Sequence, residues 1–129
     1  MLEGDALRVL GRFEDAASAY QRAARELPAP RRQQAGFLEA RVRMAELSDA
    51  PGALRALRDA EVTRIGSVLR ERGMALEVQL LTRIGSEAEA AAVAADYIRA
   101  YPEGPEAESM RARASPASED TGGDVPPDR

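Results

Sequence analysis

The chain has 129 residues, the size of a single domain, and carries a net charge of −4 with a pI near 5.0. This balance disfavours nonspecific nucleic-acid binding, which needs clustered positive charge. No apolar run approaches the ~20 residues of a membrane span, and the N-terminus lacks the pattern of a signal peptide. As written, the sequence predicts a soluble, cytoplasmic protein; a start codon further upstream would leave a periplasmic or envelope-associated location open.

Composition favours an all-α fold. Ala, Leu, Arg and Glu dominate, and all four are good helix formers. The two Phe, three Tyr and no Trp leave little bulk for a globular core. Close packing of helices through alanines suits this composition better than a sheet, because β-branched residues are few.

The residue types most used in catalysis are missing. His, Cys and Lys are absent, so the usual general base and the usual activated nucleophiles are lacking. Acidic pairs such as Glu87 with Glu89 stand at predicted helix starts, where the helix dipole favours them. The sequence therefore predicts a noncatalytic protein that has no cofactor and no metal site.

Two helices are predicted in the N-terminal part. The first spans Met1–Leu10, and Gly11 ends it. The second spans Phe13–Leu27, and Pro28 stops it. Apolar and small residues form a stripe at helical spacing along the second helix: Phe13, Ala16, Ala17, Tyr20, Ala23, Ala24 and Leu27.

Two more helices are predicted in the middle of the chain. The third spans Arg31–Leu47, after which Ser48 or Asp49 can cap the next helix. The fourth runs from Pro51 to about Arg64, with Glu61 at the edge of its inner face.

The fifth helix is predicted over Ser67–Ile84, with an interruption at Gly73. The sixth spans Glu87–Tyr101, and Ser86 with Glu89 predicts a capping box at its start.

A short seventh helix is predicted from Pro105 to about Ala114. Residues 115–129 contain almost nothing apolar, and we expect this tail to be disordered because it cannot offset the entropy of ordering.

The helices repeat with a period of about 37 residues. Positions related by this step carry similar residues: Gly11, Ser48 and Gly85; Ala16, Ala53 and Ala90; Tyr20, Leu57 and Ala94; Ala23, Ala60 and Tyr97; Pro28, Ile65 and Pro102.

The segment from Gly11 to Pro28, with Phe13, Ala16, Tyr20 and Ala23 between, resembles the second half of a tetratricopeptide repeat. The resemblance covers residues 1–114, as repeats of about 1–30, 31–66 and 67–102 and a partial repeat over 103–114. It implies a right-handed α-solenoid of three helix pairs plus a short C-terminal helix. The later repeats depart from the family pattern: Arg41 and Val78 replace its Gly, and Phe37 and Met74 occupy its Trp position.

Stacked helix pairs curve and leave a concave surface that is built mainly from the first helix of each pair. The register places these residues on that surface: Asp5, Arg8, Leu38, Val42, Ala45, Glu46, Arg72, Gln79, Thr82 and Arg83. We expect them to form a groove that binds another protein or a peptide, so that the chain acts as an interaction scaffold. The alternative interpretation is an ordinary solvated helix face.

Two alternative functions remain open. The phrase Tyr101-Pro102-Glu103-Gly104-Pro105 is similar to one found in degenerate repeats of bacterial envelope proteins and of regulators with FecR-type domains. The chain would then be a segment of such an assembly. A DNA-binding regulator is the second alternative, and it would use a helix with clustered arginines. The closest candidates are Arg31, Arg32, Arg41 and Arg43.

The N-terminal face is expected to be covered, because no helix precedes the first repeat in the chain as written. Either a second copy of the chain covers it, by self-association, or another part of a larger protein of which this chain is a segment does so. This face is predicted to consist of Leu2, Leu7, Leu10, Phe13 and Tyr20.

Overall fold

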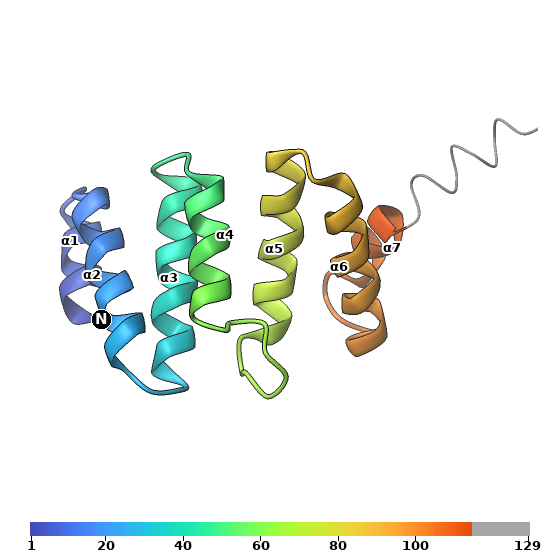
Figure 1. Cartoon of the computed structure of the whole chain (residues 1–129), viewed down its shortest axis with the longest axis horizontal. Helices are drawn as coiled ribbons and strands as arrows, with labels where there is room; N and C mark the ends of the chain where they lie inside the picture. Colours follow the sequence, from blue (N-terminus) through green and yellow to red (C-terminus); the bar gives the residue numbers. More distant parts are fainter. Residues whose placement is uncertain (115–129) are drawn as a thin grey trace, which may run out of the picture.

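The computed structural model describes residues 1–114, which form seven α-helices and no strand, so the all-α class is confirmed (Figure 1). The helices are α1 (Leu2–Val9), α2 (Phe13–Glu26), α3 (Arg31–Ala45), α4 (Ala50–Asp59), α5 (Arg70–Ile84), α6 (Glu87–Ala100) and α7 (Ala107–Ala114). The prediction of a disordered tail over 115–129 falls outside the described residues.

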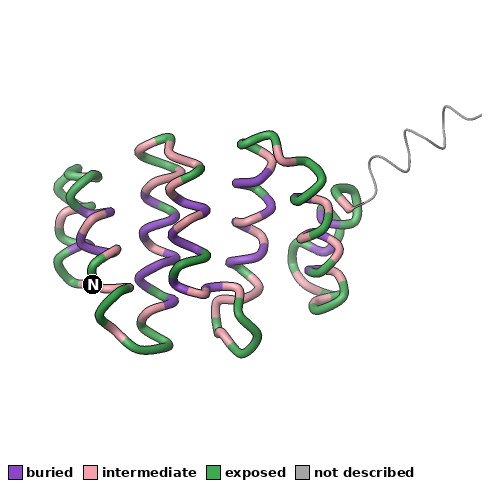
Figure 2. The backbone as a smooth tube through the Cα atoms, viewed as in Figure 1, coloured by how far each residue is buried: buried purple, intermediate pink, exposed green. Residues whose placement is uncertain are grey.

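The helices follow one another along the long axis in chain order (Figure 1). Each extensive helix–helix contact in this part of the chain joins helices that are consecutive in sequence. Buried residues accordingly lie in bands between neighbouring helices, while green, exposed segments mark the turns at their ends (Figure 2). The core is therefore elongated: one cluster of buried apolar residues runs from Phe37 to Met110, and a smaller one joins α2 to Val42 of α3.

The 37-residue register has a geometric counterpart in the turns. Gly11, Ser48 and Gly85 all adopt left-handed backbone angles, with φ of 78°, 50° and 91°. After Gly11 the chain closes α1 with a hydrogen bond from the Arg12 N–H to the Leu7 carbonyl at 2.9 Å. The first and third turns close alike, since the Ser86 N–H donates to the Leu81 carbonyl at 2.9 Å, whereas after Ser48 the Asp49 N–H reaches one residue further back, to Arg43 at 2.8 Å. The middle turn also lacks the glycine that favours a left-handed conformation.

Tyr20 is fully buried, so the prediction that it belongs to an exposed N-terminal face is wrong. Its ring packs against Gly4 of α1, and its hydroxyl donates a hydrogen bond to the Asp5 carboxylate. Leu2 and Leu10 of that face are 86% and 70% exposed, whereas Leu7 and Phe13 are half-buried against the α2 core. Val9, which the sequence analysis did not assign to the face, is 80% exposed. Self-association through this surface stays a prediction.

The fourth helix ends five residues earlier than predicted, at Asp59 rather than Arg64. Glu61 adopts a left-handed φ of 58°, and the Val62 N–H turns back to the Leu57 carbonyl at 3.0 Å. This closing turn uses no glycine or proline, so the sequence carries no local signal for it. Glu61 lies beyond the helix rather than on its inner face.

The fifth helix begins at Arg70, three residues later than predicted, because Gly66 turns the chain with a φ of 97°. Gly73 does not interrupt this helix and is buried within it. At the start of α6, Ser86 is the N-cap residue but its side chain makes no capping hydrogen bond, so the predicted capping box is not formed. Asp49 does cap α4, since it accepts a hydrogen bond from the Gly52 N–H at 2.9 Å.

The closest approach of two helices in the middle of the row is at Gly36 of α3. A Cβ at this position would overlap the Cβ of Ala60 and would lie 3.2 Å from the Ala56 carbonyl oxygen. Neither neighbour can swing away, because both atoms are fixed to the backbone of α4 and its C-terminal turn. The missing side chain is what lets α3 and α4 pack at this distance.

We predict that Gly36→Ala lowers the free energy of unfolding by about 1–3 kcal/mol through overpacking. The direction of the change in stability is informative, because replacing glycine by alanine inside a helix otherwise stabilises it by up to ~1 kcal/mol. Urea denaturation followed by circular dichroism measures the change. The matched control is Gln34→Ala on the exposed side of the same helix, where we expect no loss. A Gly36→Ala variant as stable as the parent would show that the two helices do not approach this closely.

Candidate functional site

A groove crosses the three helices α1, α3 and α5. It consists of three adjoining hollows of about 610, 360 and 200 Å³. All three share Arg41, and neighbouring hollows also share Phe37, Leu38 or Arg72. We call this continuous surface the α1–α3–α5 groove.

Eight of the ten residues that the register assigned to a partner-binding surface line this groove. They are Asp5, Arg8, Leu38, Val42, Ala45, Glu46, Arg72 and Gln79. Thr82 and Arg83, further along α5, do not line it. The Thr82 hydroxyl donates to the Val78 carbonyl at 2.8 Å and accepts from the Arg113 guanidinium at 2.7 Å, so it is engaged within the fold. The binding role of the eight stays a prediction.

Phe37 lies at the centre of the groove, although the sequence analysis named it only as the residue at the Trp position of the repeat. Its ring is 93% buried, and two guanidinium groups lie over it: that of Arg72 at 5.1 Å and that of Arg41 at 5.9 Å from the ring centroid. A cation over an aromatic face is attracted by the negative face of the ring. Since Arg41 and Phe37 are four residues apart on α3, helical spacing could have indicated that pair; the contribution of Arg72 from α5 could not be seen in the sequence.

The floor of the groove is apolar and half-covered. Leu38, Met44, Leu69 and Ala75 all retain partial exposure there, beside the buried Leu76. Exposed apolar surface next to charged groups is typical of surfaces that bind a partner.

The acidic side chains nearest the centre of the groove are already engaged. Asp5 accepts the hydroxyl of Tyr20, and Glu71 accepts the hydroxyl of Tyr97. Each pair ties the second helix of a helix pair to the first. Burial, followed by the hydrogen bond to Asp5, raises the pKa of Tyr20; the same causes, with Glu71 as acceptor, raise the pKa of Tyr97 to about 12.

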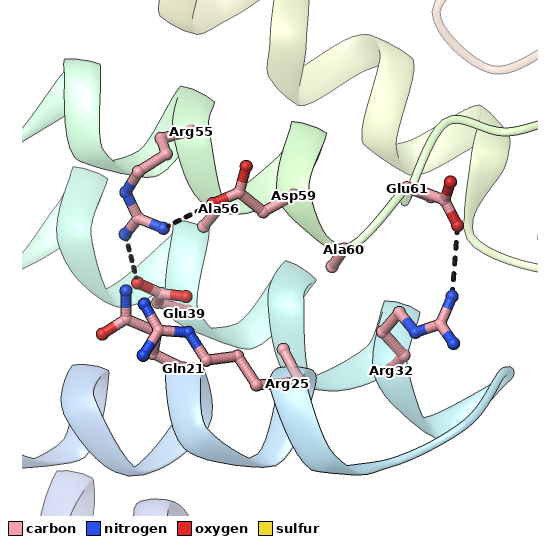
Figure 3. Close-up of a pocket in the computed structure, with 10 residues that line it drawn as sticks. Gln21, Arg25, Arg32, Glu39, Arg55, Ala56, Asp59, Ala60 and Glu61 are labelled. Carbon is pink, nitrogen blue, oxygen red and sulfur yellow. Dashed lines mark hydrogen bonds and ion pairs between the residues drawn. The ribbon is translucent and has the colours of Figure 1, made fainter.

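A second hollow of about 390 Å³ lies elsewhere, between α2, α3 and α4 (Figure 3). Its carboxylates are neutralised by its own arginines. Arg55 contacts Glu39 at 2.7 Å and Asp59 at 3.1 Å, while Arg32 contacts Glu61 at 3.1 Å. Because these charges satisfy one another, the hollow is better described as an internal brace than as a ligand site.

Glu39 is the centre of that brace. It is 99% buried, and its Oε2 accepts hydrogen bonds from Arg43 Nε on α3 and from an Arg55 guanidinium nitrogen on α4, both at 2.7 Å. Charge-assisted bonds of this length are strong, and a buried carboxylate needs them. The sequence analysis assigned Glu39 no structural role.

Within residues 1–114, no group of three or more acidic side chains is placed to hold a metal ion. No helix of this part of the chain is long and apolar enough to cross a membrane. Comparison of the sequence and the structure with protein-family models, with curated proteins and with solved structures finds no match.

We predict that Glu39→Gln lowers the free energy of unfolding by about 1–3 kcal/mol, because two arginines lose a charged acceptor while the shape is kept. Thermal or urea unfolding measures the loss. Glu26→Gln, at an exposed position near the C-terminus of α2, is the matched control and should change stability by less than ~0.5 kcal/mol. Equal effects of the two substitutions would contradict a role for Glu39 as a brace.

We predict that the protein loses stability at alkaline pH, because the pKa of the Tyr97 hydroxyl is higher in the folded chain than in the unfolded chain. In the unfolded chain a tyrosine titrates near pH 10, whereas burial and Glu71 raise the pKa of Tyr97 to about 12 in the folded chain. Between these values the folded state holds a proton that the unfolded state has lost. The corresponding stabilisation is therefore complete below about pH 10 and disappears as the pH rises to about 12.

Urea denaturation at a series of pH values measures this effect, with Tyr97→Phe as the control that cannot ionise. Across the window the parent should lose about 2–3 kcal/mol more than the variant does. Parallel pH profiles for the two proteins would show that the Tyr97 hydroxyl is not held as a neutral donor.

Proposed function

We propose that this chain is a noncatalytic protein–protein interaction scaffold whose α1–α3–α5 groove binds another protein or a peptide. In this proposal the helices form a short right-handed solenoid of tetratricopeptide-like pairs: α1 with α2, α3 with α4, and α5 with α6. The observation that carries the proposal is the groove itself, in which partly exposed apolar side chains and two ring-stacked arginines face a continuous hollow.

The repeating geometry supports the tetratricopeptide-like part of the proposal. The equivalent residues Ala16, Ala53 and Ala90 are each at least 98% buried, as small contact residues of stacked helix pairs should be. The turns at positions 11, 48 and 85 share a left-handed conformation. A groove lined by the first helix of each pair follows from such stacking, and grooves of this kind accept helices or extended peptides.

A DNA-binding role is less well supported. Arg32 is paired with Glu61, and Arg43 is paired with Glu39 and Asp49. Two of the four arginines that such a role would use are therefore already neutralised within the fold. Membership of a bacterial envelope assembly or of a FecR-type regulator is compatible with the scaffold proposal, since either would use the groove to hold a partner.

Selection of a random dodecapeptide display library on the full chain tests the proposal. We expect peptides whose binding is weakened about tenfold or more by Leu38→Glu, because that change places a charge on the apolar floor. Gln79→Arg, at an exposed groove position, should change the affinity without affecting the core, because it adds a charge beside the bound peptide. The matched control is Ile65→Glu, which puts the same charge on an exposed apolar residue of the turn between α4 and α5. Circular dichroism melts of each variant confirm that it folds.

One result would contradict the proposal. If the selected peptides bind the Leu38→Glu, Gln79→Arg and Ile65→Glu variants as tightly as the parent, the groove is not a binding surface.

A further inference from the structure

The chemistry of the groove centre points to a narrower class of partner than a general scaffold would accept. Arg41 and Arg72 come from different helices, yet both guanidinium groups lie within 6 Å of the centroid of one ring, Phe37. Both side chains are exposed above a buried ring. Two positive charges are therefore held close together at the surface of the protein.

Neither of these arginines has a carboxylate partner in the part of the chain that the structure describes. By contrast, Arg32, Arg43, Arg55 and Arg58 each contact at least one acidic side chain. The nearest acids of the groove, Asp5 and Glu71, accept tyrosine hydroxyls instead. The centre of the groove thus holds two positive charges whose guanidinium N–H groups are not bonded to a carboxylate of the described residues.

Contact with the ring restricts each guanidinium to the neighbourhood of Phe37 and does not use its N–H groups as donors to a carboxylate. An arginine restricted in this way loses less entropy when it binds a planar anion such as a carboxylate. Two of them can donate several charge-assisted hydrogen bonds to one acceptor group.

We propose that the α1–α3–α5 groove recognises an acidic residue in a peptide segment of another protein, whose carboxylate is held by Arg41 and Arg72 above Phe37. The inference rests on the proposed function and adds the chemistry of the partner. The half-exposed Leu38, Met44 and Ala75 beside the arginines receive apolar neighbours of that residue.

The acidic side chains along the groove argue for a single central acid rather than a polyanion. Glu106 lines the hollow next to α7, and in the hollow next to α1 Glu46 lies with Arg8 and offsets its charge. A nucleic acid or a run of acidic residues would be repelled at the α7 end, because like charges at close range are unfavourable. The favoured segment therefore has an Asp or Glu at its centre, apolar neighbours, and neutral or basic residues towards the end that lies near α7.

The peptides selected from the dodecapeptide library provide the test. Those that depend on Leu38 should share a central Asp or Glu. Arg41→Glu and Arg72→Glu should each weaken their binding about tenfold or more, and added salt should weaken it too. The matched control is Arg25→Glu, which makes the same charge change in the second hollow and should leave the affinity unchanged.

A charge swap makes the test independent of any loss of folding. A synthetic peptide in which the central acid is replaced by Lys should bind the Arg72→Glu chain more tightly than it binds the parent. Groove-dependent peptides without a common acid, or acidic peptides that bind the Arg→Glu variants as tightly as the parent, would overturn this inference while leaving the scaffold proposal standing. If no selected peptide depends on the groove at all, both proposals fail.

Discussion

Helix packing in this protein depends on small side chains at the points where helices meet. Ala16, Ala53 and Ala90 are almost completely buried at equivalent positions, and Gly36 lies against Ala60 at a distance that admits no side chain. With two Phe, three Tyr and no Trp in the chain, there is little bulk with which to fill a wider gap. The helices are therefore held by close contact between their backbones and small side chains rather than by large side chains that fill the space between them. This requires a short separation, since dispersion contacts are lost quickly when a gap opens.

Close packing in chain order also determines where the charges can go. Each helix is covered mainly by its two neighbours in sequence, so long arginine and glutamate side chains reach across the edges of these contacts. On the side of α2, α3 and α4 the result is the self-neutralised brace around Glu39 (Figure 3). In the α1–α3–α5 groove, the two central carboxylates, Asp5 and Glu71, accept hydrogen bonds from tyrosine hydroxyls. Arg41 and Arg72 therefore have no carboxylate partner among the described residues. The two sides therefore differ: the charges of one are paired within the fold, and the arginines of the other are the groups that we propose contact a partner.

The sequence predicted the helices well where a residue has one strong local preference. Gly11 and Gly85 mark two helix ends, because glycine adopts a left-handed φ without strain, and Pro28 marks another. The end of α4 was missed, since Glu61 adopts the same kind of conformation with no residue-type signal.

At the candidate site, too, the sequence predicted what depends on helical spacing and missed what depends on contacts between helices. Register alone placed Leu38 and Arg72 on one surface, because helical spacing is local. It could not show that Arg72 of α5 would reach the ring of Phe37 on α3, nor that Glu39 would be buried, because Arg55 comes from a different helix. From sequence alone, an aromatic residue on a helix is assigned to the core and a glutamate to the solvent-exposed face. Both assignments can change once the side chains of the neighbouring helix are known.

The central claim is that Arg41 of α3 and Arg72 of α5 are brought together over the ring of Phe37. The chain has only two phenylalanines, so selective labelling of Phe gives ring signals from Phe13 and Phe37 alone. A nuclear Overhauser spectrum of this sample measures which side chains surround each ring. The account predicts contacts from the Phe37 ring to the side chains of both Arg41 and Arg72. A Phe37 ring with contacts to its own helix and none to Arg72 would contradict it.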